Sequence, residues 1–422
     1  MRPVAISMLA WLATVGNVLA RPQPVHQQPI KQIELGPRPY FLVESMSDGP
    51  LKSKLAQCQN LNMKPSSWSF GHRGGAPLQI PEHSRESNIA GARMGAGTLE
   101  CDVAFTKDRE LVCRHSQCDL HTTTNIVALP ELNAKCTQPF RPAADGKPAS
   151  AKCCTSDITL AEFKLLCAKM DGFNASAVNA EDYLKGTPSW RTDLYATCGT
   201  VMEHKEHIAM VEALGLRHSP ELKMPMVKMP FQGDYTQEMY AQQLIDNYKN
   251  ARVPPSRVQA QSFSYDAIRY WLESEPDFGN NAMLLVESAD TPDTYAEAID
   301  KLTEYAKEGV RTVAPPMHYL VEGKNGSLTP SRYADRAQEL KLNIITWSLE
   351  RSGPLAAARA NGDYYYTRIK NGITGDGNMY ELVDVLYRQV GVVGMFSDWA
   401  ATTTFYANCF NIGLEGSGCR VS

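Results

Sequence analysis

Short runs of β-branched and apolar residues alternate with longer amphipathic stretches along most of the chain. The short runs have the length and composition of strands. They lie at 68–72, 98–105, 111–115, 218–223, 258–261, 282–286, 312–314, 343–347 and 394–397. The longer stretches place apolar residues every three or four positions, which predicts helices. These lie at 158–170, 207–215, 236–251, 265–275, 294–309, 331–341 and 379–390.

The order of these elements predicts the fold class. Strand followed by helix, repeated about eight times, is typical of an α/β protein built as a (β/α)8 TIM barrel. We place one barrel at 67–407, interrupted by a cysteine-rich insertion at 117–200. The run at 111–115 follows its predecessor after the polar segment KDRE, so we expect a hairpin there rather than a helical crossover.

The two ends of the chain depart from this pattern. Residues 1–20 combine Arg2, an apolar run and the small-residue end Val18-Leu19-Ala20, which indicates a signal peptide. Residues 21–66 are rich in proline, glutamine and lysine, with one helix expected within 45–58, and 408–422 form a tail. We therefore expect a secreted protein, extracellular or in the cell wall.

The cysteine content fits that location, because disulfides persist outside the cytosol. Of eleven cysteines, six lie between positions 113 and 167, and we expect disulfides that hold the insertion rather than a zinc site. The odd count leaves a thiol unpaired, for which Cys101 is our candidate, and Cys409 is a possible partner of Cys419. Sequons at Asn174 and Asn325 predict surface loops.

Charge and hydropathy exclude some classes of partner. With 42 basic and 46 acidic residues, the net charge of −4 argues against nucleic acid as a ligand. No stretch after the leader approaches the roughly 20 apolar residues that a membrane span needs, so we expect no stable membrane insertion. The oligomeric state is not set by these features.

Candidate chemistry is concentrated between residues 70 and 115. Glu100 and Asp102 flank Cys101 in the strand-like run TLECDVAF, so alternation places both carboxylates on one face. Two carboxylates on one buried face repel each other unless a cation lies between them. Oxygen ligands alone suit a hard ion, so we expect a divalent cation, Ca²⁺ or Mg²⁺.

Five elements of this stretch resemble the glycerophosphodiester phosphodiesterase family. They are His72-Arg73-Gly74, Pro81-Glu82, Glu100-Cys101-Asp102-Val103, Thr106-Lys107-Asp108 and His115. The segment HSPELKMP adds the Glu-x-Lys of the family as Glu221 and Lys223. The sequence departs from the family pattern in two places: Ser116 follows the second histidine in place of Asp, and His83-Ser84 stand where the family has Asn-Thr. These differences concern substrate preference more than activity.

The resemblance implies roles for individual residues. His72 and His115 are the acid–base pair, and Glu100, Asp102 and Glu221 are the metal ligands. Arg73, Lys223 and Trp347 contact the substrate, and Glu82 orients His72 or Arg73.

Some of these roles have a plainer alternative. Glu221 and Lys223 would otherwise form an ordinary ion pair, Glu82 would be a loop carboxylate, and Trp347 would be a core residue. Which histidine is the acid, and whether water or a substrate hydroxyl attacks, stay open. Asp398, after the last strand, is a further candidate for shaping the pocket.

A second histidine cluster, Glu203-His204-Lys205-Glu206-His207, lacks the spacing of a zinc-binding helix. We interpret it as the solvated first turn of a helix.

The function implied by the resemblance is metal-dependent hydrolysis of glycerophosphodiesters, such as glycerophosphocholine or glycerophosphoinositol, to sn-glycerol 3-phosphate and an alcohol. One alternative is a phospholipase-type enzyme acting on intact lysophospholipid or sphingomyelin, which needs an exposed apolar rim at the barrel mouth. Another is an inactive binding or cell-wall protein that keeps the fold.

Overall fold

The computed structural model describes residues 28–192, 194–195 and 198–414. The predicted leader at 1–20 and the end of the tail lie outside this part. Eight parallel strands close into a barrel, because β1 pairs with both β2 and β15. They are β1 (Ser66–Gly71), β2 (Ala96–Phe105), β8 (Arg217–Leu222), β9 (Gln261–Ser262), β10 (Met283–Leu285), β11 (Thr312–Ala314), β14 (Asn343–Leu349) and β15 (Gly394–Ser397). The predicted (β/α)8 TIM barrel is confirmed.

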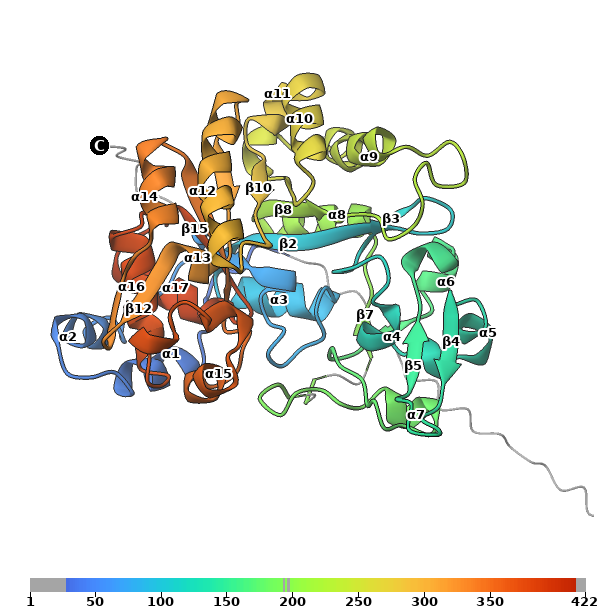
Figure 1. The fold of residues 1–422 in the computed structure, drawn as a ribbon, viewed down its shortest axis with the longest axis horizontal. Helices are drawn as coiled ribbons and strands as arrows, with labels where there is room; N and C mark the ends of the chain where they lie inside the picture. Colours follow the sequence, from blue (N-terminus) through green and yellow to red (C-terminus); the bar gives the residue numbers. More distant parts are fainter. Residues whose placement is uncertain (1–27, 193, 196–197, 415–422) are drawn as a thin grey trace, which may run out of the picture.

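Helices surround the barrel (Figure 1). In chain order they are α3 (Arg85–Arg93), α8 (His204–Leu214), α9 (Gln237–Asn250), α10 (Tyr265–Ser274), α12 (Pro292–Lys307), α14 (Arg332–Glu339), α16 (Asn378–Arg388) and α17 (Ala400–Cys409). The main core fills the space between helices and strands. A smaller cluster, including Phe70, Met283 and Phe396, comes from residues of the barrel strands. No helix within the described residues is both long and apolar enough to cross a bilayer.

Two short helices, α1 (Arg38–Glu44) and α2 (Pro50–Ala56), precede the barrel and contact α17. The helix expected within 45–58 is α2, whereas α1 was not predicted. The suggested Cys409–Cys419 pair is wrong, because Cys409 is bonded to Cys58. Packing of α2 against α17 brings these two cysteines to a Cα–Cα distance of 5.4 Å. Cys419 lies outside the described residues.

The insertion has its own hydrophobic core, which includes Leu120, Phe163 and Tyr183. Figure 1 shows it beside the barrel, in cyan to green. Its elements are α4 (Leu120–Thr123), α5 (Pro130–Asn133), β4 (Gln138–Arg141), β5 (Ser150–Lys152), α6 (Leu160–Phe163), β6 (Cys167–Ala168), α7 (Ala180–Tyr183) and β7 (Gly199–Thr200).

Disulfides hold the insertion as predicted, joining Cys118 to Cys154, Cys136 to Cys153 and Cys167 to Cys198. The long helix expected at 158–170 ends instead at Phe163. Cys167–Ala168 pairs with Gly199–Thr200, and these tertiary contacts override the local helical periodicity.

The expected hairpin is present as β3 (Leu111–Cys113), antiparallel to the end of β2. It corrects one prediction, since Cys101 is bonded to Cys113 rather than free. Folding β3 back on β2 brings the two Cα atoms to 5.2 Å, within the range that a disulfide spans. That proximity depends on the hairpin register and is not visible from the position of Cys101 alone.

A second correction concerns the histidine cluster at 203–207. The helix does begin there, but His204 and His207 are 0% and 1% exposed rather than solvated. His204 contacts Tyr248 and Asn247 of α9, and His207 contacts Asn88 of α3. Packing between neighbouring barrel helices therefore buries the two histidines, while Lys205 and Glu206 of the same turn are exposed.

Candidate active site

Three carboxylates meet at the end of two neighbouring strands. The register pairs Asp102 of β2 with Glu221 of β8, and Glu100 lies two residues earlier on the same face of β2. One oxygen from each lies within 4.8 Å of the others, and the three residues are 3%, 1% and 5% exposed for Glu100, Asp102 and Glu221. The three predicted metal ligands are thus brought together.

The electrostatics of this cluster favour a bound cation. Burial and the neighbouring Asp102 and Glu221 charges raise the pKa of Glu100 well above its usual value. Burial also raises the pKa of Glu221 to about 8, against the opposing effect of Lys223. Asp102 Oδ1 is buried with no hydrogen-bond partner among the described residues. Closely spaced oxygen donors with an unsatisfied acceptor fit a hard divalent ion.

His72 lies immediately after β1, at the same end of the barrel. Its Nδ1 contacts Asp398, which follows β15, and Ser348 Oγ lies 2.8 Å from the same nitrogen. Its Nε2 lies 3.9 Å from Glu100 Oε2. Burial lowers the pKa of His72 to about 4 despite the Asp398 charge. The ring is therefore neutral at pH 7 and held in one orientation.

His115 follows β3 and lines the same pocket. Atoms of Glu82 and Asp119 lie within 4.8 Å of its ring nitrogen. Burial, with the Arg73 and Lys223 charges, holds its pKa well below 6.5. Unlike His72, the His115 ring makes no hydrogen bond to the described part of the chain.

The cationic side chains of the pocket are paired with carboxylates. Arg73 Nη1 donates to both oxygens of Glu82 at 2.9 Å, and the Arg73 backbone N–H donates to Glu100 Oε2 at 2.7 Å. Glu82 thus contacts Arg73 rather than His72. Lys223 Nζ lies 2.6 Å from Glu221 Oε1, so the contact considered as the alternative is present, and Lys223 also lines the pocket.

The three residues that differ from the family pattern have defined contacts. His83 Nε2 lies 2.9 Å from Asp102 Oδ2, so this histidine contacts one member of the carboxylate cluster. Ser84 begins α3 as its N-cap, with its hydroxyl accepting from the Ser87 N–H at 3.1 Å. Ser116 Oγ lies 3.0 Å from Met226 Sδ at the pocket edge.

Beyond the charged groups the pocket is aromatic. Its volume is about 440 Å³, and Phe263, Trp347, Tyr364 and Tyr365 line it. Trp347 lies in the pocket wall with its Nε1–H donating to Ala314 O at 2.8 Å, so it both contacts the pocket and packs against β11.

Sequence reasoning missed several polar partners of the site. It placed Asp398 near the pocket but not on His72, and it did not single out Arg351, whose Nη1 lies 2.9 Å from Asp398 Oδ2. Gln261 Nε2 donates to Glu100 Oε1 at 2.8 Å, from the strand after Glu221. The insertion contributes Arg191, 3.4 Å from Asp398 Oδ2. The contact between Asp398 and His72 could have been predicted, because the first and last strands of a closed barrel are neighbours. No feature of the sequence predicts the contact of Arg191.

Comparison with known proteins agrees with this geometry. The model of the "Glycerophosphoryl diester phosphodiesterase family" matches residues 72–402. An "Extracellular protein" of Arthroderma benhamiae is 49% identical over 245 residues, which cover 58% of this chain and 100% of that protein. The "Glycerophosphodiester phosphodiesterase GDPD6" of Arabidopsis thaliana is 22% identical over 387 residues, covering 87% and 94%.

A solved structure shares the fold. The putative glycerophosphoryl diester phosphodiesterase of Silicibacter pomeroyi superposes with a TM-score of 0.52 and 16% identity, covering 86% of this chain and 98% of that one. The family match extends over well more than half of the chain and includes the residues of the pocket. This protein therefore belongs to the glycerophosphoryl diester phosphodiesterase family and is a phosphodiester-hydrolysing enzyme.

Proposed function

We propose that this protein is a secreted, divalent-metal-dependent hydrolase of glycerophosphodiesters. Its substrates would be glycerophosphocholine, glycerophosphoinositol or a related small molecule, and its products sn-glycerol 3-phosphate and an alcohol. The observation that carries the proposal is the carboxylate cluster of Glu100, Asp102 and Glu221, within 4.8 Å of one another and close to His72. A Ca²⁺ or Mg²⁺ ion bound there would supply fixed positive charge beside a phosphate.

His72 acts as the general base. Its Nδ1 is held by Asp398, so its Nε2 is the nitrogen that accepts a proton from the attacking water or substrate hydroxyl. The Asp398 carboxylate then stabilises the imidazolium that forms, as in other histidine–aspartate pairs. Arg351, beside Asp398, keeps that carboxylate ionised by lowering its pKa.

His115 lines the same pocket and acts as the general acid that protonates the departing alkoxide. Its pKa is held well below 6.5 in the empty site, so the proton it delivers depends on the negative charge of the bound phosphodiester, which favours the imidazolium. Arg73 and Lys223 bind phosphate oxygens, and Glu82 holds the Arg73 side chain in place. Trp347 contacts the organic part of the substrate.

The test is release of glycerol 3-phosphate from glycerophosphocholine by the purified protein. Release should stop with chelator and return with Ca²⁺ or Mg²⁺. His72→Ala and Glu100→Gln should each lower kcat by about 100- to 10,000-fold. Glu131→Gln, at an exposed carboxylate of the insertion, is the matched control and should keep full activity. Full turnover in His72→Ala would reject the assignment.

Secretion is part of the same proposal. The disulfides and the leader at 1–20 support it, as does the similarity to a protein named "Extracellular protein". Asn325 is exposed in the turn between β12 (Val321–Lys324) and β13 (Ser327–Pro330), where a glycan would fit. The measurement is the first residue of the protein recovered from culture medium, which should be Arg21. A chain kept inside the cell with its leader uncleaved would contradict secretion.

One observation favours the second candidate, activity on intact lysophospholipid. Met224 and Met226 line the pocket yet are 57% and 51% exposed, and Tyr364, which also lines the pocket, is 36% exposed. These side chains form an apolar edge that an acyl chain would contact. Lysophosphatidylcholine turnover that falls in Met224→Ser/Met226→Ser, with glycerophosphocholine turnover unchanged, would support this activity.

A further inference from the structure

We propose that the Cys101–Cys113 disulfide is a positioning element of the active site, which holds His115 in place relative to the metal carboxylates. The proposal rests on the function proposed above, in which His115 acts on the substrate. It assigns to two cysteines a part in the chemical step beyond a general contribution to stability.

The disulfide joins the two strands that carry the chemistry. Cys101 lies between Glu100 and Asp102 on β2, and Cys113 lies two residues before His115 at the end of β3. The bond therefore links the backbone of the metal-binding strand directly to the backbone that places the second histidine. The other disulfides of the described residues lie in the insertion or join the segment after α2 to α17. The nearest of them, Cys118–Cys154, begins three residues after His115 and does not involve β2 or β3.

His115 depends on its backbone more than His72 does. Asp398 and Ser348 hold the His72 ring, whereas no hydrogen bond from the described residues holds the His115 ring. Its position follows from the path of β3, which has only three residues and pairs with β2 from Phe105 to Val103.

Beyond the last strand pair, the Arg114 N–H donates to Asp102 O at 2.7 Å. Hydrogen bonds of this kind each stabilise by about 1 kcal/mol and break in local fluctuations, whereas the disulfide is covalent. The disulfide is therefore the covalent link between the backbone that enters His115 and the strand that carries Glu100 and Asp102.

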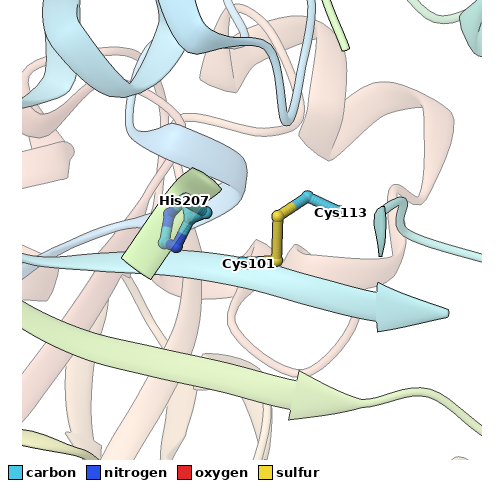
Figure 2. A group of neighbouring side chains, drawn as sticks. All are labelled: Cys101, Cys113 and His207. Carbon is cyan, nitrogen blue, oxygen red and sulfur yellow. A yellow bond between two sulfur atoms is a disulfide. The ribbon is translucent and has the colours of Figure 1, made fainter. Parts of the chain in front are cut away.

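His207 closes the space behind the disulfide. Figure 2 shows its ring beside the two sulfur atoms, and a ring nitrogen lies within 4.8 Å of both. His207 Nε2 bonds to Asn88 Oδ1 at 3.1 Å, while its Nδ1 is buried without a partner. Cys101, Cys113 and His207 are 0%, 1% and 1% exposed, so the disulfide is enclosed by protein atoms.

The experiment compares two disulfides that close loops of similar length. Cys101→Ala/Cys113→Ala removes a 12-residue link beside the site, and Cys136→Ala/Cys153→Ala removes a 17-residue link within the insertion. Loop-closure entropy predicts nearly equal losses of stability for the two variants. Only the first should slow the reaction, with kcat on glycerophosphocholine falling about 10- to 100-fold because misplacing a catalytic group by about 1 Å costs that much.

The leaving group separates positioning from general damage. His115→Ala should lose kcat on glycerophosphocholine but little on bis(p-nitrophenyl) phosphate, because nitrophenolate leaves without protonation. Cys101→Ala/Cys113→Ala should reproduce this pattern in milder form, with KM and metal affinity unchanged. If the double alanine variant does not fold, Cys101→Ala/Cys113→Val can be used for the same test, because it places a β-branched residue in β3 at position 113.

The outcomes are distinct. An inactive His115→Ala together with a fully active disulfide variant would overturn the positioning proposal and leave the proposed function intact. Equal losses on both substrates, with weakened metal binding, would show general disruption and overturn it as well. Full activity of His115→Ala on glycerophosphocholine would reject the role of His115, and the positioning proposal with it.

Discussion

Metal binding to the carboxylate cluster should release protons, so its affinity should rise steeply with pH. At 4.8 Å, two ionised carboxylates repel by about 3.5 kcal/mol at an effective dielectric constant of 20. The metal-free protein relieves this repulsion by keeping a proton on Glu221, whose pKa burial and the Asp102 charge raise to about 8. A cation needs the ionised form, so it competes with that proton.

The size of the effect follows from the pKa. At pH 6, two units below the pKa of Glu221, displacing the proton costs about 2.7 kcal/mol, or about 100-fold in affinity relative to pH well above 8. Glu100, whose pKa is also raised, would add to this change.

The same group affects stability without metal. Because the pKa of Glu221 is higher in the folded than in the unfolded chain, its contribution to the free energy of unfolding is fully present below pH 4.5. It is lost as pH rises to 8, by up to about 5 kcal/mol. Added metal should therefore raise the melting temperature most at alkaline pH.

Titration calorimetry with Ca²⁺ and Mg²⁺ at pH 6 and pH 8.5, in two buffers that differ in ionisation enthalpy, measures both affinity and proton release. We expect at least one proton released per ion at pH 6, and none from Glu221 well above pH 8. Glu221→Gln should lose tight metal binding at either pH. Affinities within threefold of each other across this range, with no buffer dependence, would refute the reasoning.

Three further outcomes are expected. Asp398→Asn should lower kcat by about 100- to 10,000-fold with little change in KM, because the base His72 loses the carboxylate that stabilises its charged form. A normal kcat in steady-state kinetics would count against the proposed role of the His72–Asp398 pair. Removing the Cys58–Cys409 bond, which spans 351 residues, should lower the free energy of unfolding by roughly 5 kcal/mol in denaturant titrations while kcat is kept. Burial lowers the pKa of His218 to about 3, so its contribution to the free energy of unfolding is present above pH 6.5 and lost as pH falls toward 3. In His218→Gln the free energy of unfolding should therefore fall less on acidification, by about 1.4 kcal/mol per pH unit below 6.5. An unchanged pH slope in denaturant titrations would show that this histidine titrates normally.

The periodicity of the sequence was sufficient to predict the barrel, and the family motif was sufficient to predict which carboxylates form the cluster. Glu100 and Asp102 share a face because strand side chains alternate, and Glu221 joins them because β8 pairs with β2 in register. The first fact follows from alternation along one strand, whereas Glu221 was assigned through the resemblance to the family. Its place beside Asp102 agrees with the rule that consecutive parallel strands are neighbours. The roles of these residues in catalysis stay predictions that the kinetic tests above address.

What depends on contacts between distant segments was not available from the sequence. Asp398 reaches His72 only because the last strand closes against the first, and Arg191 reaches Asp398 only because the insertion folds back over the barrel. The two mistaken cysteine predictions have the same origin.

Periodicity along the chain therefore predicted the barrel strands, the helices around them and the fold class, and the family motif predicted the acidic, basic and histidine groups of the pocket. Tertiary structure alone decided the disulfide partners, the burial of His204 and His207, the early end of the helix at Phe163 and the hydrogen bonds that orient His72. The physical reason is that alternation and helical period are fixed within a few residues, whereas pairing and burial depend on which surfaces are brought together when the chain closes on itself.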